Sequence, residues 1–515
     1  MAKVAFIGAG SVGFTRRLFR DILSVPELVD TRFAFTDISK RNLDMVTQLC
    51  RKDLKANGLP ARVAATLDRR RALDGADYVI NCTRIGGLEA FRLDIDVPLK
   101  YGVDQCVGDT LCAGGILYGQ RNIPCILDFC RDIREVAAPD ALFLNYANPN
   151  AMNTWAAVEY GGVRTLGLCH GVEGGWRQIA DVLGAENFRD VQIVCAGINH
   201  QTWYIKIIHE GREVSGEELL EAFERHPRYP QTEKIRLDVL RRFGYYSTES
   251  NGHLSEYVPW YRKRPNEIRK WIDLGSWIHG ETGGYLRVCT EGRNWFNTDF
   301  PSWMKAENPP IGPETRGTEH ASWIIEALET GRTYRGHFNV RNHGCISNLP
   351  VDCIVEVPGY VDRTGVHIPR VGPLPLACAA TCQASVDVQR MAVKAAVSGD
   401  VRLLKQAMLH DPLTAAVCDP VEIWQLTDEM LVAEAKWLPQ YRVEIPKAKR
   451  RLAAAKRKGE YRGTRKWKGA ARLKVRSVSQ MRRRAAESRR RAAAADKAAD
   501  DRARDTRKGK RGRRG

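Results

Sequence analysis

The sequence predicts an α/β fold that opens with a doubly wound parallel sheet, and three observations support this. Short apolar runs alternate with helix-compatible stretches over the first two hundred residues. A glycine-rich turn directly follows the first apolar run, and polar side chains follow several later runs at the point where each ends. Such alternation is typical of parallel sheets with right-handed crossovers.

The predicted elements divide the chain into two folded segments. In residues 1–196 we expect strands at 4–7, 32–36, 62–65, 77–82, 141–145, 164–168 and 191–196, with helices at 39–56, 119–137 and 174–183. Residues 197–446 read as an α+β domain for substrate and metal. Its expected strands are 201–209, 337–347 and 352–357, and its expected helices are 216–225, 318–330, 374–398, 401–409 and 421–440.

The glycine-rich turn predicts a Rossmann-type dinucleotide site. Its first glycine permits the tight turn, its second lets the backbone approach a pyrophosphate, and its third lets the helix pack closely on the strand. Phosphates then bind at the helix N-terminus, where unpaired N–H groups favour anions. The expected cofactor residues are Gly8, Gly10, Ser11, Val12 and Gly13. The alternative is a turn that the fold requires and that binds nothing.

Asp37 ends the second predicted strand, where a carboxylate would bind the adenosine ribose hydroxyls. This favours NAD over NADP. Arg41, close by, weakens the preference because an arginine can accommodate a 2′-phosphate.

Charge and composition set the last segment apart. The chain carries a net charge of +19, yet residues 447–515 hold 29 Lys and Arg against 6 Asp and Glu, so the remainder is mildly acidic. Large apolar residues almost vanish there, which predicts a disordered basic tail. It is either a solvated extension without a specific partner or an arm that contacts nucleic acid non-specifically.

Cysteine use and hydropathy favour the cytoplasm. The fourteen cysteines show no spacing framework, which fits free thiols in a reducing compartment. No apolar run approaches the roughly 20 residues that a membrane span needs, so no membrane contact is expected.

Polar residues at the predicted strand ends point to a single site. Asp37, Thr83, Arg84, Asn148 and Cys169 each follow a strand directly or nearly so. In open α/β sheets ligands bind beyond the carboxyl ends of the strands. We therefore expect these side chains at one edge of the sheet.

Seven short motifs occur in order from residue 81 to residue 352. They are NCTRIGG at 81–87, GDT at 108–110, NYANP at 145–149, GLCHG at 167–171, GINH at 197–200, SEYVP at 255–259 and NLPVD at 348–352. As a set they resemble glycoside hydrolase family 4, the NAD- and divalent-metal-dependent glycosidases, and most of all its α-galactosidase-like branch. The resemblance spans about residues 1–440 and implies a nucleotide domain similar to that of lactate and malate dehydrogenases.

The resemblance implies a redox mechanism in place of two carboxylates. NAD⁺ takes hydride from C3 of the sugar, a base removes the C2 proton, the glycosidic oxygen leaves, water adds and the hydride returns. Cys169 and His200 match the metal ligands, and Mn²⁺ or another divalent first-row ion would stabilise the developing charge.

Roles for the other residues stay open. His170, where phosphoglycosidase relatives carry Asp or Asn, could protonate the leaving oxygen or only orient the sugar. His253 or Tyr257 could be the base. Asp109 and Asn148 are expected on sugar hydroxyls, and Arg84 on sugar or cofactor phosphate.

The reaction predicted is hydrolysis of small-molecule α-glycosides, most of all α-galactosides, by a homo-oligomer (a dimer or tetramer). An α-glucosidase or α-hexuronidase of the same family is the nearest alternative. A net NAD-dependent 2-hydroxy acid dehydrogenase and a nucleic-acid-binding protein acting through its tail are the more distant ones.

Overall fold

The computed structural model describes residues 1–272, 277–464, 469, 471–488 and 490. The chain forms two compact units. The first comprises Met1–Leu286 with Ala306–Leu473, and the second comprises Arg287–Lys305 with Lys474–Gly515. All the predicted site residues belong to the first unit.

The first six strands form the parallel, doubly wound half of a long sheet. They are β1 (Lys3–Ile7), β2 (Arg32–Thr36), β3 (Arg62–Thr66), β4 (Tyr78–Asn81), β5 (Leu142–Asn145) and β6 (Thr165–Gly167), in the order β3-β2-β1-β4-β5-β6. The chain order reverses beside β1, as it does in doubly wound folds that bind nucleotides. The predicted α/β class is confirmed.

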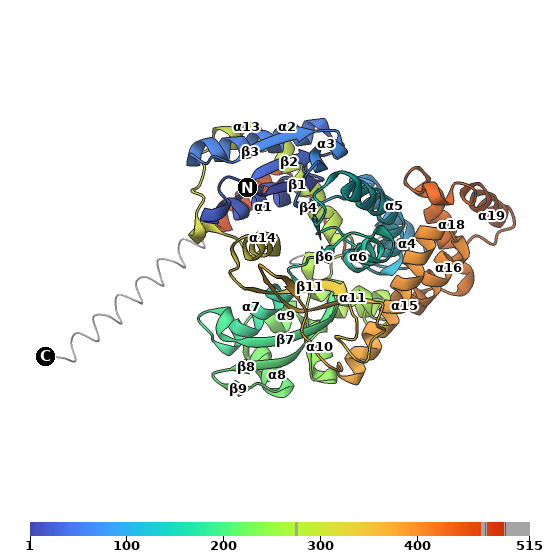
Figure 1. The fold of residues 1–515 in the computed structure, drawn as a ribbon. Coiled ribbons are helices and arrows are strands. Elements are labelled where there is room, and N and C mark those ends of the chain that lie inside the picture. Colours follow the sequence, from blue (N-terminus) through green and yellow to red (C-terminus); the bar gives the residue numbers. More distant parts are fainter. Residues whose placement is uncertain (273–276, 465–468, 470, 489, 491–515) are drawn as a thin grey trace. The chain divides into compact units, whose positions relative to one another are not determined.

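The same sheet continues with antiparallel strands, so the two predicted segments share it. These strands are β7 (Gln192–Ile198), β8 (Gln201–His209), β9 (Arg212–Glu213), β10 (Tyr246–Ser247), β11 (Tyr334–Arg341), β12 (Ile354–Asp362) and β13 (Gly365–His367). Beyond β6 the order is β11-β12-β7-β8-β10 (Figure 1). The expectation that 191–196 closes the parallel sheet is wrong, because β7 pairs antiparallel with β8 and β12.

The described residues contain the following α-helices. They are α1 (Val12–Leu23), α2 (Lys40–Asn57), α3 (Arg69–Leu73), α4 (Gly87–Leu99), α5 (Cys112–Val136), α6 (Asn150–Ala156), α7 (Gly171–Leu183), α8 (Gly216–Arg225), α9 (Tyr229–Thr232), α10 (Lys234–Phe243), α11 (Asn251–Tyr257), α12 (Pro265–Trp271), α13 (Gly284–Lys305), α14 (His320–Thr330), α15 (Leu376–Ser398), α16 (Val401–His410), α17 (Pro412–Val417), α18 (Pro420–Ala433) and α19 (Ile445–Arg457).

Two helices differ from the predicted bounds by seven residues at one end. α5 begins at Cys112 and not at 119, because glycines that lower helix propensity are required there by packing: a Cβ on Gly115 would lie 2.5 Å from the Thr110 carbonyl carbon. The helix expected over 421–440 ends at Ala433.

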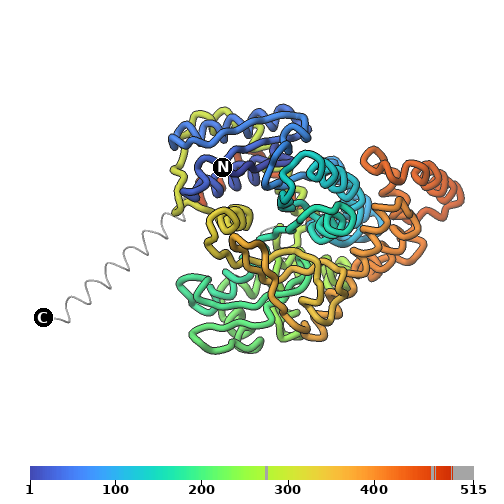
Figure 2. The backbone as a smooth tube through the Cα atoms, in the orientation of Figure 1, coloured from blue at the N-terminus to red at the C-terminus, as the bar shows by residue number. Residues whose placement is uncertain are grey.

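The main hydrophobic core lies between the sheet and the later helices. Buried apolar side chains of α5, α6, α15, α16 and α18 form one cluster with those of β7, β8 and β12. Figure 2 shows these late helices, orange to red, grouped together with α5. The cluster includes Val103 and Leu111, which lie on either side of Asp109 in the sequence.

The basic tail is partly folded, so the prediction of disorder from residue 447 is wrong for its described part. α19 buries Ala448 and Leu452. Nε and Nη2 of Arg451 each donate to an oxygen of Asp428 on α18, at 2.7 Å. Ala471 packs with Ile268 and Ile272. Residues 491–515 lie outside the described residues.

The second unit is held together by arginine–carboxylate pairs. Arg476 pairs with Glu291 at 3.1 Å, and Arg482 pairs with Asp299 of α13. Residues 478–488, which precede the last described position, are helical.

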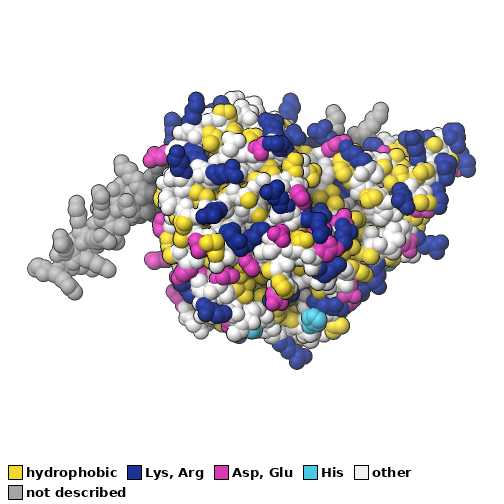
Figure 3. Space-filling view, turned by 45° about the horizontal axis from the view of Figure 1, so that its top comes forward, with side chains coloured by type: hydrophobic (Ala, Val, Ile, Leu, Met, Phe, Trp, Pro, Cys, Tyr) yellow, Lys and Arg dark blue, Asp and Glu magenta, His cyan; other side chains and the backbone are white. Residues whose placement is uncertain are grey.

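Surface charge and thiols complete the description. Lys and Arg side chains gather at the right-hand end of the face in Figure 3, over the C-terminal helices of the first unit. All fourteen cysteines fall within the described part of the chain and are free thiols, as predicted. Of the helices in the described residues, none combines the length and apolar character that a membrane crossing requires.

Candidate active site

The glycine-rich turn has the geometry of a dinucleotide loop. Gly8 adopts a φ of 84° and leaves no room for a side chain, because a Cβ would lie 2.9 Å from backbone atoms of Cys82 and Thr83. The Ser11 side chain makes no capping hydrogen bond to α1. The first-turn N–H groups of α1 are therefore left without that usual partner, as an anion-binding helix end requires.

Two details of this loop go beyond the prediction. Gly10 donates its N–H to Asp37 Oδ2 at 2.8 Å, while Asp37 Oδ1 accepts from Ser39 N–H at 2.8 Å, so the carboxylate also braces the turn. A Cβ on Gly13 would meet nothing within 4 Å. Close packing on the strand is therefore not the reason for the third glycine, contrary to our expectation.

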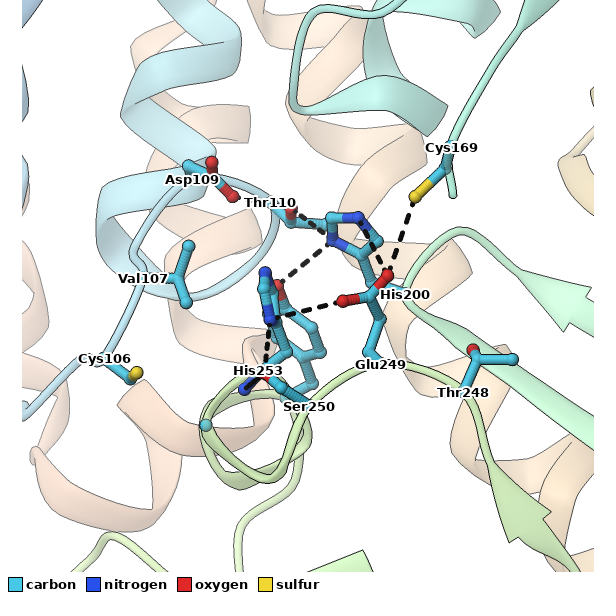
Figure 4. Close-up of polar contacts among 12 residues, drawn as sticks. Cys106, Val107, Asp109, Thr110, Cys169, His200, Thr248, Glu249, Ser250 and His253 are labelled. Atoms are coloured by element: carbon cyan, nitrogen blue, oxygen red, sulfur yellow. Dashed lines mark hydrogen bonds and ion pairs between the residues drawn. The ribbon is translucent and has the colours of Figure 1, made fainter. Parts of the chain in front are cut away.

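Cys169 and His200 come together at the end of β6 and in the turn between β7 and β8. Within the described residues, one possible ligand atom from each of Cys169, His200 and Glu249 lies within 4.8 Å of the others. A second such group joins His200 to Asp109 and His253. Figure 4 shows His200 at the centre of both groups.

The tautomer of His200 is set by Thr110. The Thr110 hydroxyl donates to Asp109 Oδ1 at 3.0 Å and lies 2.9 Å from His200 Nδ1. Because its one hydrogen is used, the hydroxyl accepts from Nδ1–H. The lone pair of His200 is then on Nε2, which faces Cys169 and Glu249 (Figure 4).

Glu249 links the predicted ligands to the predicted bases. Its Oε1 lies 3.6 Å from both Cys169 Sγ and His200 Nε2, and its Oε2 lies 3.3 Å from His253 Nδ1. Burial alone would raise the pKa of Glu249, but attraction to the protonated imidazoles of His200 and His253 lowers it to about 2, so Glu249 ionises at a lower pH than the one at which His253 becomes neutral. Glu249 is thus a carboxylate.

His253 and Tyr257 are both buried beside His200. Burial lowers the pKa of His253 to about 4, which keeps the imidazole neutral. Tyr257 places its hydroxyl 3.4 Å from His200 Nδ1, and burial together with Glu256 raises its pKa well above the usual value. Of the two, the imidazole is the better proton acceptor as the site stands.

Asp109, Arg84 and Asn148 meet as one polar cluster. Asp109 Oδ2 accepts from Asn148 Nδ2 at 3.1 Å and from Arg84 at 3.2 Å. The Arg84 guanidinium also lies over the rings of Phe91 and Tyr118, at 4.2 and 4.9 Å from their centroids. The loop that carries Asp109 is held by Glu256, which accepts from three successive N–H groups, those of residues 106–108.

His170 stands apart from this network by its contacts. Its side chain is 63% exposed, and its Nδ1 lies 3.6 Å from Glu319. It precedes α7 without capping it through its side chain.

Sequence reasoning missed Glu249 and Thr110. Thr110 is the last residue of the GDT motif, and Glu249 lies four residues before His253. The position of Glu249 depends on β10, a strand of two residues that no local pattern announces.

Comparison with known proteins identifies the family. The model described as "Family 4 glycosyl hydrolase" matches residues 3–185, and that of its C-terminal domain matches 195–414. An α-galactosidase of Rhizobium meliloti is 62% identical over 480 residues, covering 93% of this chain and 97% of the relative. An α-galactosidase of Bacillus subtilis is 33% identical, covering 86% and 100%.

A solved structure has the same fold. The 6-phospho-β-glucosidase of Thermotoga maritima, determined with manganese, NAD⁺ and glucose-6-phosphate, superposes with a TM-score of 0.68 at 24% identity, covering 84% of this chain and 99% of that one. The two family matches, which together span most of the chain, show that this chain belongs to glycosyl hydrolase family 4.

Proposed function

We propose that the protein hydrolyses α-galactosides with NAD⁺ and a divalent metal as resident cofactors. The observation that carries the proposal is the 62% identity to an α-galactosidase over 93% of the chain. The fourteen free thiols are consistent with a reducing cytoplasm. Assembly as a dimer or tetramer stays a prediction.

The residues present fit both cofactors. The turn from Gly8 to Gly13 offers N–H groups of α1 to a pyrophosphate, and Asp37 retains lone pairs for ribose hydroxyls. Cys169 Sγ and His200 Nε2 offer a soft and an intermediate ligand to a first-row ion. When bound, NAD⁺ exchanges hydride with C3 of the sugar, and the metal acts as a Lewis acid toward the sugar hydroxyls.

The chain's own groups handle the sugar and the protons. Asp109, Asn148 and Arg84 form a fixed polar surface that can orient hydroxyls. His253 Nδ1 lies 2.8 Å from the Ser250 hydroxyl and 3.3 Å from Oε2 of Glu249, and in the tautomer that donates Nδ1–H to this carboxylate the second ring nitrogen carries the lone pair. We assign His253 as the base that removes the C2 proton, with Tyr257 as the alternative. The exposed His170 is the proposed acid for the leaving oxygen.

The test is an assay of 4-nitrophenyl α-galactoside, α-glucoside and α-glucuronide with protein stripped of nucleotide and metal. Hydrolysis of the galactoside that requires added NAD⁺, Mn²⁺ and thiol, with solvent deuterium at C2 of the released sugar, is the expected result. Hydrolysis without NAD⁺ would refute the mechanism. Faster turnover of another glycoside would move the substrate within the family, and stoichiometric loss of NAD⁺ would indicate a dehydrogenase.

A further inference from the structure

We propose that Glu249 is a third protein ligand of the divalent metal, bound through Oε1 together with Cys169 and His200. The inference rests on the proposed function, which supplies the metal, and adds a residue that neither the motifs nor the relatives assign. Four features of the structure support it.

The first feature is the spacing of the donor atoms. Oε1 of Glu249 lies 3.6 Å from Cys169 Sγ and 3.6 Å from His200 Nε2. Ligands about 2.0 to 2.3 Å from one ion, at a tetrahedral angle, lie about 3.3 to 3.8 Å from each other. Both separations are therefore those of neighbouring ligands on a single ion, and all three donor atoms lie within 4.8 Å of one another.

The second feature is the arrangement of hydrogens. The Thr110 hydroxyl accepts from Nδ1–H of His200, so Nε2 and Oε1 of Glu249 face each other with lone pairs and make no hydrogen bond to one another. Oε1 accepts instead from the Cys169 thiol at 3.6 Å, and a cation that replaces this thiol proton can bind the sulfur, the nitrogen and the oxygen together.

The third feature is how the fold directs Glu249 to this place. β10 pairs with β8, Tyr246 opposite Tyr204 and Ser247 opposite Trp203, and Thr248 N–H donates to the Thr202 carbonyl at 2.8 Å. The chain then turns at Glu249 with a φ of 66°, and His200 has a φ of 64°. Non-glycine residues in this conformation are strained and persist where the surroundings impose it, which is common at functional sites.

The fourth feature is the room made by Gly171. A Cβ on Gly171 would lie 1.9 Å from Glu249 Oε1. Gly171 begins α7 without a positive φ, so its backbone would accept alanine, a stronger helix former. The three atoms nearest to such a Cβ all belong to Glu249, so the missing side chain at Gly171 makes room for this carboxylate.

Direct Mn²⁺ binding tests this inference. The chelator-treated full-length protein, saturated with NAD⁺, is titrated with Mn²⁺, and free Mn²⁺ is followed by its paramagnetic resonance signal. We expect Glu249→Gln and Gly171→Ala each to raise the Mn²⁺ Kd about 10- to 100-fold. The Mn²⁺ Kd of the double variant should not exceed the higher of the two single-variant values, because both substitutions remove the same ligand.

The matched control is Gly174→Ala on the same helix, where a Cβ meets nothing within 4 Å; its Kd should stay within about twofold of the parent value. Circular dichroism melts verify folding of each variant, and Gly171→Ala retains every charged group if Glu249→Gln folds poorly. Parent-like Mn²⁺ affinity in both variants would overturn the assignment of Glu249 while leaving the proposed function intact. A parent protein that hydrolyses α-galactoside without binding Mn²⁺ would instead refute the role of the metal both in this inference and in the proposed function.

Discussion

The hydroxyl of Thr110 lies 2.9 Å from Nδ1 of His200 and fixes which nitrogen of that ring is free. Replacing Thr110 with valine removes the acceptor and keeps the shape of the side chain. The imidazole can then turn or change tautomer, so we expect Mn²⁺ affinity to fall about 10- to 100-fold, as it does when hydrogen-bond partners of metal ligands are removed. Thr110→Ser, which retains the hydroxyl, should restore most of it. The measurement is the Mn²⁺ titration of the NAD⁺-saturated protein.

Cys169→Ser should abolish activation by Mn²⁺. A serine hydroxyl is a far weaker ligand than a thiolate for a first-row ion, and the Cys169 thiol must lose its proton on binding, although burial and Glu249 raise its pKa well above the usual value. We expect kcat to fall by more than about 100-fold at saturating NAD⁺. Unchanged dependence of the rate on Mn²⁺ concentration would show that Cys169 is not a ligand.

Gly10→Ala and Gly13→Ala should act differently. A Cβ on Gly10 would lie 2.8 Å from Asp37 Oδ2, whereas one on Gly13 meets no protein atom within 4 Å. We expect Gly10→Ala to lower the stability of the NAD-free protein by about 1 to 3 kcal/mol. Gly13→Ala should leave that stability within about 0.5 kcal/mol and weaken NAD⁺ binding only. Thermal melts with and without NAD⁺ separate the two effects, and equal melting temperatures for both NAD-free variants would contradict this account.

Local chemistry explains what the sequence could predict. The turn from Gly8 to Gly13 and the strand before it are adjacent in sequence, so pattern alone indicated their geometry. The positions of Cys169 and His200 came from motifs. Strand direction is different, because it depends on a distant partner. Residues 191–196 read as one more parallel strand, yet β7 pairs antiparallel with β8 and with β12, which begins at Ile354.

Glu249 escaped prediction for the same reason. Its place depends on a two-residue strand that pairs with Trp203 and Tyr204, more than forty positions earlier in the chain. The tail was misread because composition averages over α19. Leu452 follows three basic residues and is nonetheless buried, and Arg451 serves as a partner of buried Asp428.

Removing residues 447–515 should destabilise the protein. The deletion exposes the surface covered by Ala448 and Leu452 and takes Arg451 from Asp428, a buried carboxylate that keeps only Lys405 at 2.7 Å. We expect a loss of about 2 to 4 kcal/mol in the free energy of unfolding. A chain ending at residue 490 should have the same melting temperature as the full-length protein and retain its α-galactosidase activity. Identical melting of the chain that ends at residue 446 and the full-length chain would show that α19 contributes nothing to stability.

Glu356 should make stability depend on pH. It is 2% exposed, accepts one hydrogen bond from Asn199 at 3.1 Å, and burial raises its pKa to about 8 from an ordinary value of 4.5. A carboxyl whose pKa is raised on folding contributes stability that is complete below the unfolded pKa and is lost as pH rises through the folded pKa. The free energy of unfolding should therefore fall by about 2 to 5 kcal/mol between pH 5 and pH 9 from this group.

Glu356→Gln keeps the hydrogen bond to Asn199 without a titratable group. We expect the variant to lose this part of the pH dependence and to exceed the parent in stability at pH 9, with little difference at pH 5. Urea unfolding of the metal-free proteins at both pH values measures the change. Parallel pH profiles for the two proteins would mean that Glu356 is ionised throughout, and that its buried charge is compensated by the protein around Asn199.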